Sequence, residues 1–189
     1  MSVKKVCCFT GHRSQKLPCI SDDQHPDTRL LKDALRTEIL GLAMSGCRDF
    51  LIGCADGMDV IFGELVLEAR EMLGGSPRLV CCLPYAGFHL HYSEPWQSRC
   101  SALLQSADEI IATGDRYARG CFHIRNRRMV DLSTDVLAVY NGGPGGTAYT
   151  IRYASKQNKD ITIFSVQDGK LWITVDSKAY ERPRLPPRS

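Results

Sequence analysis

Short runs of apolar residues alternate along this chain with longer stretches in which apolar residues recur every three or four positions. The short runs predict strands at residues 5–10, 50–52, 79–83, 109–112, 136–140, 161–166 and 171–175. The longer stretches predict helices at residues 27–46, 57–73, 121–132 and 147–158, and one more that starts at residues 93–95. Strands and helices that alternate in this order form βαβ units. The expected fold is therefore an α/β domain with a mostly parallel sheet.

Two of the predicted helices carry specific expectations. Asp27 is the expected N-cap of the first, because its side chain can accept hydrogen bonds from the free N–H groups of the first turn. The second is apolar on most of its sides, with Ile61, Leu65 and Met72 among its residues. We therefore expect the second helix to be well buried.

The composition is that of an ordinary globular protein. The 189 residues are 43% hydrophobic and 24% charged, which suits one well-packed domain. We assign residues 1–176 to that domain and residues 177–189, which are rich in Pro and Arg, to a solvated tail. The formal net charge of +3 is mild, whereas nucleic-acid-binding domains are usually more basic, so no nucleic-acid partner is expected.

The nine cysteines do not form a disulfide pattern, since their number is odd and no two are spaced as Cys-x-x-Cys. The adjacent pairs Cys7-Cys8 and Cys81-Cys82 lie inside predicted strands. Neighbouring strand residues point to opposite faces, so both faces of the sheet are expected to be buried. Reduced thiols, and the absence of any apolar run near the roughly 20 residues that span a bilayer, predict a cytoplasmic protein without membrane contact.

Three glycine-containing loops follow predicted strands, at the sheet edge where parallel α/β folds bind ligands. In the first loop, Gly11 permits a sharp exit from the strand. His12 follows, and Arg13 offers a planar guanidinium to a phosphate or carboxylate. The alternative is an ordinary turn with an exposed arginine.

The second loop contains Gly53 and Gly57 and leads into a helix, whose first N–H groups favour an anion. Asp56 and Asp59 lie at the same place and either cap the helix or accept hydrogen bonds from ribose hydroxyls. Capping is the favoured role of Asp59. Glu64 lies among apolar residues, so it is expected either to be buried with a partner or to face the ligand.

The third loop gives the strongest prediction of a phosphate site. Gly142, Gly143, Gly145, Gly146 and Thr147 connect a strand to a helix. So many glycines let the backbone approach an anion closely, and Thr147 adds a hydroxyl. The loop is neither a P-loop nor a dinucleotide-binding Gly-x-Gly-x-x-Gly motif.

Arg125 and Asn126 belong to a basic segment of the predicted helix at residues 121–132, together with Arg127 and Arg128. Arg125 and Arg128 are three residues apart and are expected to share a helix face. One or two of these arginines are expected in the ligand cleft, and the alternative is a solvated basic face.

No metal site is expected. His89 and His91 are two residues apart, but no acid or cysteine lies near them at a usual ligand spacing. Structural or surface histidines are the favoured interpretation, and no Ser-His-Asp order or nucleophile elbow is present.

In their order along the chain, these segments resemble the YpsA-like branch of the SLOG superfamily. The matching segments lie at residues 8–13, 53–64, 83–85, 125–131 and 139–154. The resemblance implies a Rossmann-like, three-layer α/β/α fold and the binding of nucleotides or nucleotide-derived metabolites such as NAD or ADP-ribose. It also implies a homo-oligomer. No cofactor is expected to be required, and a bound nucleotide or phosphate is the candidate occupant.

The same superfamily contains phosphoribohydrolases, whose motif Pro-Gly-Gly-x-Gly-Thr-x-x-Glu ends in a glutamate. Aligned on Gly146 and Thr147, that glutamate falls on Thr150. Cleavage of an N-glycosidic bond needs a carboxylate near the anomeric carbon, which Thr150 does not supply. If the chain is a glycohydrolase, Glu64, Asp56 or Asp59 must take that role.

Three functions are therefore carried forward. The first is binding or sensing of a nucleotide-derived, phosphate-bearing metabolite, with Arg13 and the glycine loops on the phosphate and Asp56 or Glu64 near the ribose. The second is hydrolysis of a nucleotide or an N-glycosidic bond at the same site. The third is a nucleic-acid or protein interaction through residues 116–128 and the basic tail. The candidates for the walls that contact a base are Tyr85, Phe88, Trp96 and Tyr117.

Overall fold

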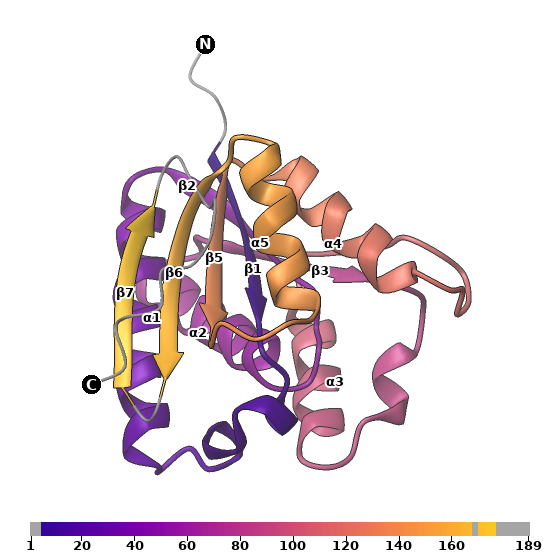
Figure 1. Ribbon diagram of the computed structural model, residues 1–189, viewed down its shortest axis with the longest axis horizontal. Helices are drawn as coiled ribbons and strands as arrows, with labels where there is room; N and C mark the ends of the chain where they lie inside the picture. Colours follow the sequence, from indigo (N-terminus) through magenta and orange to yellow (C-terminus); the bar gives the residue numbers. More distant parts are fainter. Residues whose placement is uncertain (1–4, 168–169, 177–189) are drawn as a thin grey trace.

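A computed structural model describes residues 5–167 and 170–176, which form one sheet between two layers of helices (Figure 1). The strands are β1 (Lys5–Gly11), β2 (Cys47–Ile52), β3 (Arg78–Leu83), β4 (Glu109–Ala112), β5 (Asp135–Tyr140), β6 (Asp160–Gln167) and β7 (Lys170–Asp176). The α-helices are α1 (Pro26–Met44), α2 (Met58–Met72), α3 (Trp96–Ser106), α4 (Cys121–Leu132) and α5 (Gly146–Lys156). Short 3₁₀ helices lie at Ser14–Lys16, Pro18–Ser21 and Phe88–His91.

The sheet has the strand order β4-β3-β2-β1-β5-β6-β7. Every neighbouring pair is parallel except β6 and β7, which are antiparallel. The chain thus builds outward from β1 to β4 and then crosses back to place β5 on the other side of β1. The predicted α/β fold with a mostly parallel sheet is confirmed.

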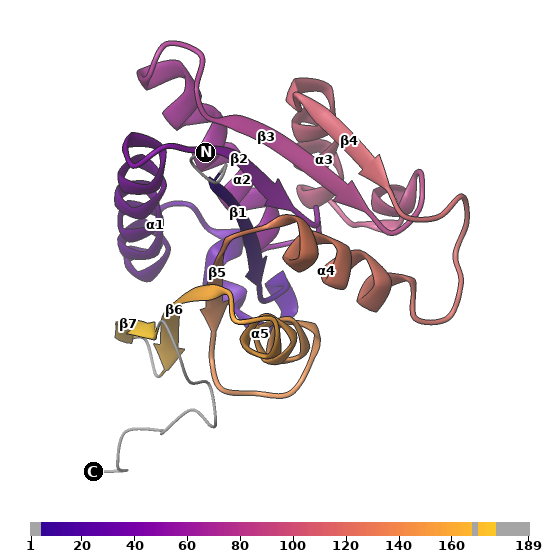
Figure 2. The ribbon, with the colours of Figure 1, turned by 90° about the horizontal axis from the view of Figure 1, so that it is seen from above.

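The helices divide between the two faces of the sheet. Helices α1, α2 and α3 cover one face, and α4 and α5 cover the other (Figure 2). This division follows from the strand order, because right-handed crossovers place a helix on opposite faces when the chain moves in opposite directions. The result is the expected three-layer, Rossmann-like arrangement.

The adjacent cysteines fill both faces of the sheet, as predicted. Cys7 and Cys81 pack in the core beneath α1, α2 and α3, while Cys8 and Cys82 pack in the core beneath α4 and α5. All nine cysteines lie within the described residues and are free thiols. Burial raises the pKa of Cys8 to about 12, so this thiol is unreactive in the folded protein.

Two predictions about the helices are wrong in detail. His25, and not Asp27, is the N-cap of α1, and its Nδ1 accepts a hydrogen bond from the Asp27 backbone N–H at 3.2 Å. The helix begins earlier because Pro26 has a φ angle suited to the first helical position and lacks the N–H that would be unsatisfied there. Met72 is 65% exposed, because it lies in the last turn of α2, beyond the part that packs on the sheet.

The predicted tail at residues 177–189 and the predicted turn at residues 168–169 lie outside the described residues. Among the helices that the structure describes, none combines the length and apolar character needed to cross a bilayer.

Candidate functional site

A pocket of ≈360 Å³ lies at the carboxyl ends of the central strands. It is lined by the end of β1 and the loop after it, the start of α2, one side of α4 and the first turn of α5. The chain leaves the adjacent strands β1 and β5 toward opposite layers, and such a reversal opens a crevice in α/β sheets. The predicted edge of the sheet therefore carries a pocket.

The first turn of α5 faces this pocket with Gly145, Gly146 and Thr147. Gly145 is the N-cap, with φ at 146°, and no side chain among the described residues caps the helix. The Thr147 hydroxyl donates to the Gly11 carbonyl at 3.0 Å and so joins α5 to the end of β1. Uncapped N–H groups at a helix start attract an anion.

The other glycines of this loop, Gly142 and Gly143, are not among the pocket-lining residues. Gly143 donates its N–H to the Asn141 side chain at 3.0 Å, while Gly142 has φ at 85°. These two glycines shape the turn, so only the second half of the glycine cluster reaches the pocket.

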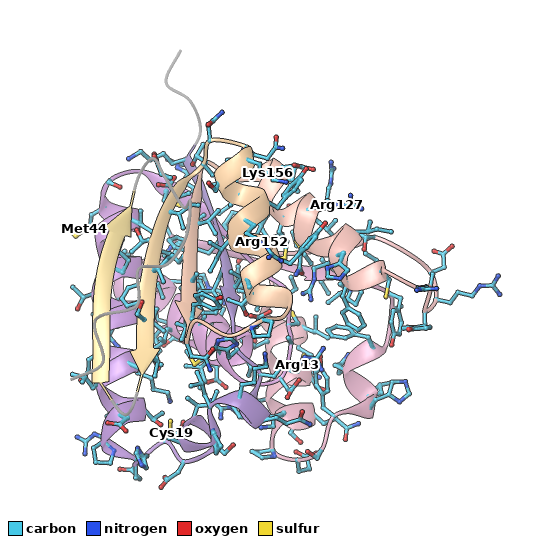
Figure 3. The ribbon with its side chains drawn as sticks, viewed as in Figure 1. Arg13, Cys19, Met44, Arg127, Arg152 and Lys156 are labelled. Carbon is cyan, nitrogen blue, oxygen red and sulfur yellow. The ribbon has the colours of Figure 1, made fainter. Side chains whose placement is uncertain are left out.

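Arg13 lines the pocket at the foot of α5, where Figure 3 labels it. Its Nη1 lies 3.2 Å from Asp56 Oδ1, and its guanidinium lies 5.7 Å from the centre of the Phe122 ring. Asp56 also accepts a hydrogen bond from the Ser14 hydroxyl at 3.0 Å. Asp56 is not among the lining residues, so it orients Arg13 from behind.

Gly57 brings the first and second loops together. A Cβ at this position would lie 2.5 Å from Ser14 N and 2.9 Å from His12 O. The adjacent Met58 N–H donates to the His12 carbonyl at 3.2 Å. Gly57 therefore serves close backbone packing and not direct contact with a ligand in the pocket.

Arg125 is the most deeply buried cation of the site, with 4% of its surface exposed. Its Nη1 donates to the Cys82 carbonyl at 3.4 Å and lies 4.0 Å from Asp59 Oδ2. Its Nε has no hydrogen-bond partner among the described residues, although Arg125 lines the pocket. A buried donor without a partner is costly, and this nitrogen is closed to solvent, so Arg125 acts on the pocket through its charge.

The absence of a side chain at Gly53 leaves room for the Arg125 guanidinium. A Cβ on Gly53 would lie 1.5 Å from Arg125 Nη1 and 2.8 Å from Asp59 Oδ2. The guanidinium thus occupies the space that any other side chain would fill. Gly53 supports the site in this way without lining it.

Asp59 is the single carboxylate among the described residues that line the pocket. Burial raises the pKa of Asp59, while the nearby Arg125 charge and a hydrogen bond from the Ala55 N–H at 3.2 Å act in the opposite direction. Arg13, Lys16 and Arg125 outnumber this acid, so the pocket favours an anion.

His12 links the first loop to the third. It is buried, and its Nε2 accepts a hydrogen bond from the Asn141 N–H at 3.0 Å. Burial, together with the Lys16 charge, lowers the pKa of His12 to about 4. His12 is therefore a neutral acceptor near neutral pH, and its Nε2 is committed to the loop.

Glu64 lies outside the pocket lining, which corrects its candidate role beside the ligand. Its two carboxylate oxygens accept hydrogen bonds from Arg99 Nε at 2.7 Å and Arg99 Nη2 at 2.5 Å. Arg99 in turn lies over the Trp96 ring, 4.7 Å from its centre. The alternative that Glu64 is held by a partner is the one that the structure supports.

Of the arginines of α4, one lines the pocket, within the one or two that were expected there. Arg125 is buried in the pocket, whereas Arg128 is exposed, so the two do not share an environment. Asn126 lines the pocket and donates to the Thr150 hydroxyl at 2.9 Å. Around His89 and His91, and elsewhere in the described ranges, no group of three metal-ligating side chains is found.

Several lining residues were not expected from the sequence. Lys16 donates from Nζ to the Pro144 carbonyl at 2.5 Å and so connects the first and third loops. Phe122 offers its ring to the pocket, whereas the Phe9 ring is fully buried and stacks on Phe62, 4.1 Å between ring centres. Of the predicted wall residues, Tyr85 packs edge-on against Phe88 and Tyr117, and none of the four lines the pocket. Phe122 could have been found from the sequence, because it lies just before the basic segment at residues 125–128.

Comparisons with known proteins agree with this architecture. The family model described as "YspA SLOG family" (YpsA) matches residues 7–170. UPF0398 proteins of Bacillus thuringiensis (strain Al Hakam) and Bacillus cereus (strain AH187) are 23% identical over 158 residues, covering 82% of this chain and 85% of theirs.

Three solved structures share the fold. TM1055, a structural-genomics target, has a TM-score of 0.52 and 21% identity, covering 83% of this chain and 72% of that one. DNA processing protein A of Helicobacter pylori has a TM-score of 0.59 and 18% identity, with coverage of 89% and 68%. DprA of Streptococcus pneumoniae has a TM-score of 0.60 and 16% identity, with coverage of 87% and 52%.

Substitution of Gly53 tests the packing beneath Arg125. Gly53→Ala is expected to lower the free energy of unfolding by about 1–3 kcal/mol or more, because the new methyl group displaces a buried guanidinium. Gly41→Ala is the matched control, since a Cβ there meets nothing within 4 Å in α1. It should raise stability by roughly 0.5–1 kcal/mol. Urea unfolding of wild type and both variants measures these free energies. Equal stability of Gly53→Ala and wild type would contradict the packing role of Gly53.

The low pKa of His12 predicts a loss of stability in mild acid. As the pH falls from 6.5 toward 4, the unfolded chain binds a proton at this residue that the folded protein does not, so the free energy of unfolding decreases. The loss should be about 2 kcal/mol between about pH 7 and pH 5.

His12→Gln keeps a hydrogen-bond acceptor but does not titrate. The variant should therefore lack the part of the acid-induced stability loss that comes from His12. The raised pKa of Asp59 acts in the opposite direction and cancels when the two proteins are compared. Urea unfolding at both pH values provides the comparison, and parallel pH profiles would show that His12 is not the group responsible.

Proposed function

This chain belongs to the YpsA family of SLOG proteins, and from that premise we propose that it binds a phosphate-bearing, nucleotide-derived metabolite in the pocket at the ends of β1 and β5. The observation that carries the proposal is the meeting of the uncapped start of α5 with three cationic side chains. One of these, Arg125, is buried with its Nε unpartnered. Backbone N–H groups, guanidinium groups and an ammonium group are the donors that bind phosphate.

The rest of the pocket suits a nucleoside. Phe122, which is half-buried, provides apolar surface for a base, and Asp59 provides an acceptor for ribose hydroxyls. Asp59 is thus the proposed ribose-binding acid in place of Asp56 and Glu64, because these two are paired with Arg13 and Arg99. The volume of ≈360 Å³ is near the lower end of small-molecule sites, which favours a mononucleotide inside the pocket. A larger ligand such as NAD or ADP-ribose would extend beyond it.

A second candidate is a hydrolase acting at the same site. Its support is the buried Asp59 carboxylate, whose raised pKa is a property of many acid–base groups. The hydroxyl of Thr150 donates to the Gly146 carbonyl at 2.9 Å and accepts from Asn126, so it is engaged in the fold. Binding without turnover is therefore the preferred function.

The earlier expectation that nucleic acid is not a partner gains no support from the structural neighbours. The structure of DNA processing protein A from Helicobacter pylori concerns its binding of single-stranded DNA. A homo-oligomer stays a prediction.

Ligand binding should stabilise the protein and depend on Arg13. A nucleotide at about 100 times its Kd should raise the free energy of unfolding by roughly 2.7 kcal/mol. Arg13→Ala should weaken binding about 10- to 100-fold, because it removes charge-assisted hydrogen bonds. Thermal shifts with AMP, ADP-ribose, NAD, cyclic nucleotides and inorganic phosphate, followed by calorimetry, measure both effects.

Arg29→Ala is the matched control for that experiment, since Arg29 is an exposed arginine on α1, in the layer across the sheet from α4 and α5. It should leave the affinity unchanged. If none of these ligands stabilises the wild type, the proposed function is wrong.

Turnover is tested with the same panel. We expect each nucleoside phosphate to be recovered intact after prolonged incubation with the protein, as measured by chromatography of bases and nucleotides. Release of free base that disappears in Asp59→Asn would instead establish the hydrolase, since this variant removes the carboxylate and preserves the size of the side chain.

A further inference from the structure

The outer seam between α4 and α5 begins at the pocket and continues away from it. Three contacts join the two helices in succession: the His123 and Tyr149 rings, whose centres are 4.2 Å apart, Asn126 with Thr150 at 2.9 Å, and Tyr153 with Asp131 at 2.8 Å. His123, Asn126 and Thr150 also line the pocket. A ligand in the pocket that extends beyond it therefore meets this seam.

Positive charge is concentrated on these two helices. Together α4 and α5 contain five basic residues and one acidic residue, whereas the whole chain contains 24 basic and 21 acidic residues. The remainder of the chain is thus slightly acidic. The mild net charge of the protein conceals a strongly basic surface.

Four of these basic residues are exposed, namely Arg127, Arg128, Arg152 and Lys156. Figure 3 shows Arg127 on α4, and Arg152 and Lys156 along α5 above Arg13. None of the four forms an ion pair with another described residue. The acid of this seam, Asp131, is engaged by the Tyr153 hydroxyl. The cations are therefore available to an external anion.

Aromatic rings lie among these cations. His123, Tyr149 and Tyr153 come from the same two helices, and Arg127 is near enough to Tyr153 for its charge to oppose the rise in the Tyr153 pKa caused by Asp131. Cations that follow a phosphate backbone, combined with rings on which bases stack, are the features of surfaces that bind single-stranded nucleic acid.

We propose that the α4–α5 seam binds single-stranded nucleic acid, with one nucleotide phosphate of the strand held in the pocket. This inference rests on the proposed function, because the pocket provides the anchor. A single strand is required, since paired bases could not stack on the seam and the pocket volume of ≈360 Å³ suits one nucleotide. Acidic proteins and anionic membranes would be attracted by the same charges, but neither carries a nucleotide that fits the pocket.

The test is fluorescence anisotropy with labelled thymidine and uridine decanucleotides at several salt concentrations. The decanucleotides should bind wild type at least about tenfold more tightly than the mononucleotide dTMP, measured by competition. Arg127→Ala with Arg152→Ala should reduce the slope of log affinity against log salt by about 1.4, because each phosphate contact on a single strand contributes roughly 0.7. The DNA and RNA arms distinguish the two kinds of strand.

Matched variants distinguish the effect of where a charge lies on the protein from the effect of the total charge. Arg29→Ala with Arg48→Ala removes two exposed arginines away from the seam and should leave the slope near that of wild type. Tyr149→Leu should weaken decanucleotide binding about fivefold or more while dTMP binding is retained, because stacking is lost and the pocket is intact. The thermal midpoint of each variant establishes that it is folded.

The outcomes distinguish this inference from the proposed function. If dTMP binds and the decanucleotides bind no more tightly, the inference is wrong and the pocket function stands. If the seam and control arginine variants have the same salt slope, or inorganic polyphosphate competes as well as a decanucleotide, the inference is also overturned. If neither dTMP nor any decanucleotide binds, the inference fails, whereas the proposed function is decided by the panel of AMP, ADP-ribose, NAD, cyclic nucleotides and inorganic phosphate.

Discussion

The need to compensate the buried Arg125 guanidinium governs the architecture around the pocket. A charged group removed from water is tolerated only where partners and hydrogen bonds replace its hydration. The Cys82 carbonyl at the end of β3 and the Asp59 carboxylate of α2 provide part of that compensation, and the absence of a side chain at Gly53 provides the space. Since Arg125 belongs to α4, this one side chain relates both helical layers across the edge of the sheet.

The glycines of the second and third loops look alike in sequence but serve different physical purposes. Gly57 lets two backbones touch, Gly53 leaves room for a guanidinium, and Gly145 forms an uncapped helix start. Only the last of these purposes is direct access to an anion. The combined effect is nevertheless a single site, because His12, Lys16 and Thr147 join the loops by hydrogen bonds to backbone groups.

Much of the fold was predictable because the apolar runs are short and regularly separated. The start of β2 was not, since Arg48 and Asp49 interrupt its apolar pattern; Asp49 is nevertheless buried and paired with Arg78 at 3.2 Å. Lys16 lies in a 3₁₀ segment that has no periodic pattern. Glu64 was ambiguous because its partner, Arg99, is distant in sequence. Local patterns thus located the edge that carries the site, whereas the partners of each charge depend on tertiary contacts.

The buried cysteines give the protein internal reporters of its own opening. Cys7 and Cys8 are adjacent in the chain but lie in the cores of opposite layers, and burial raises the pKa of both thiols. A thiol reagent reaches Cys7 only when the layer of α1, α2 and α3 separates from the sheet, and reaches Cys8 only when α4 and α5 do. Modification rates at these neighbouring residues would therefore resolve the local stability of each layer.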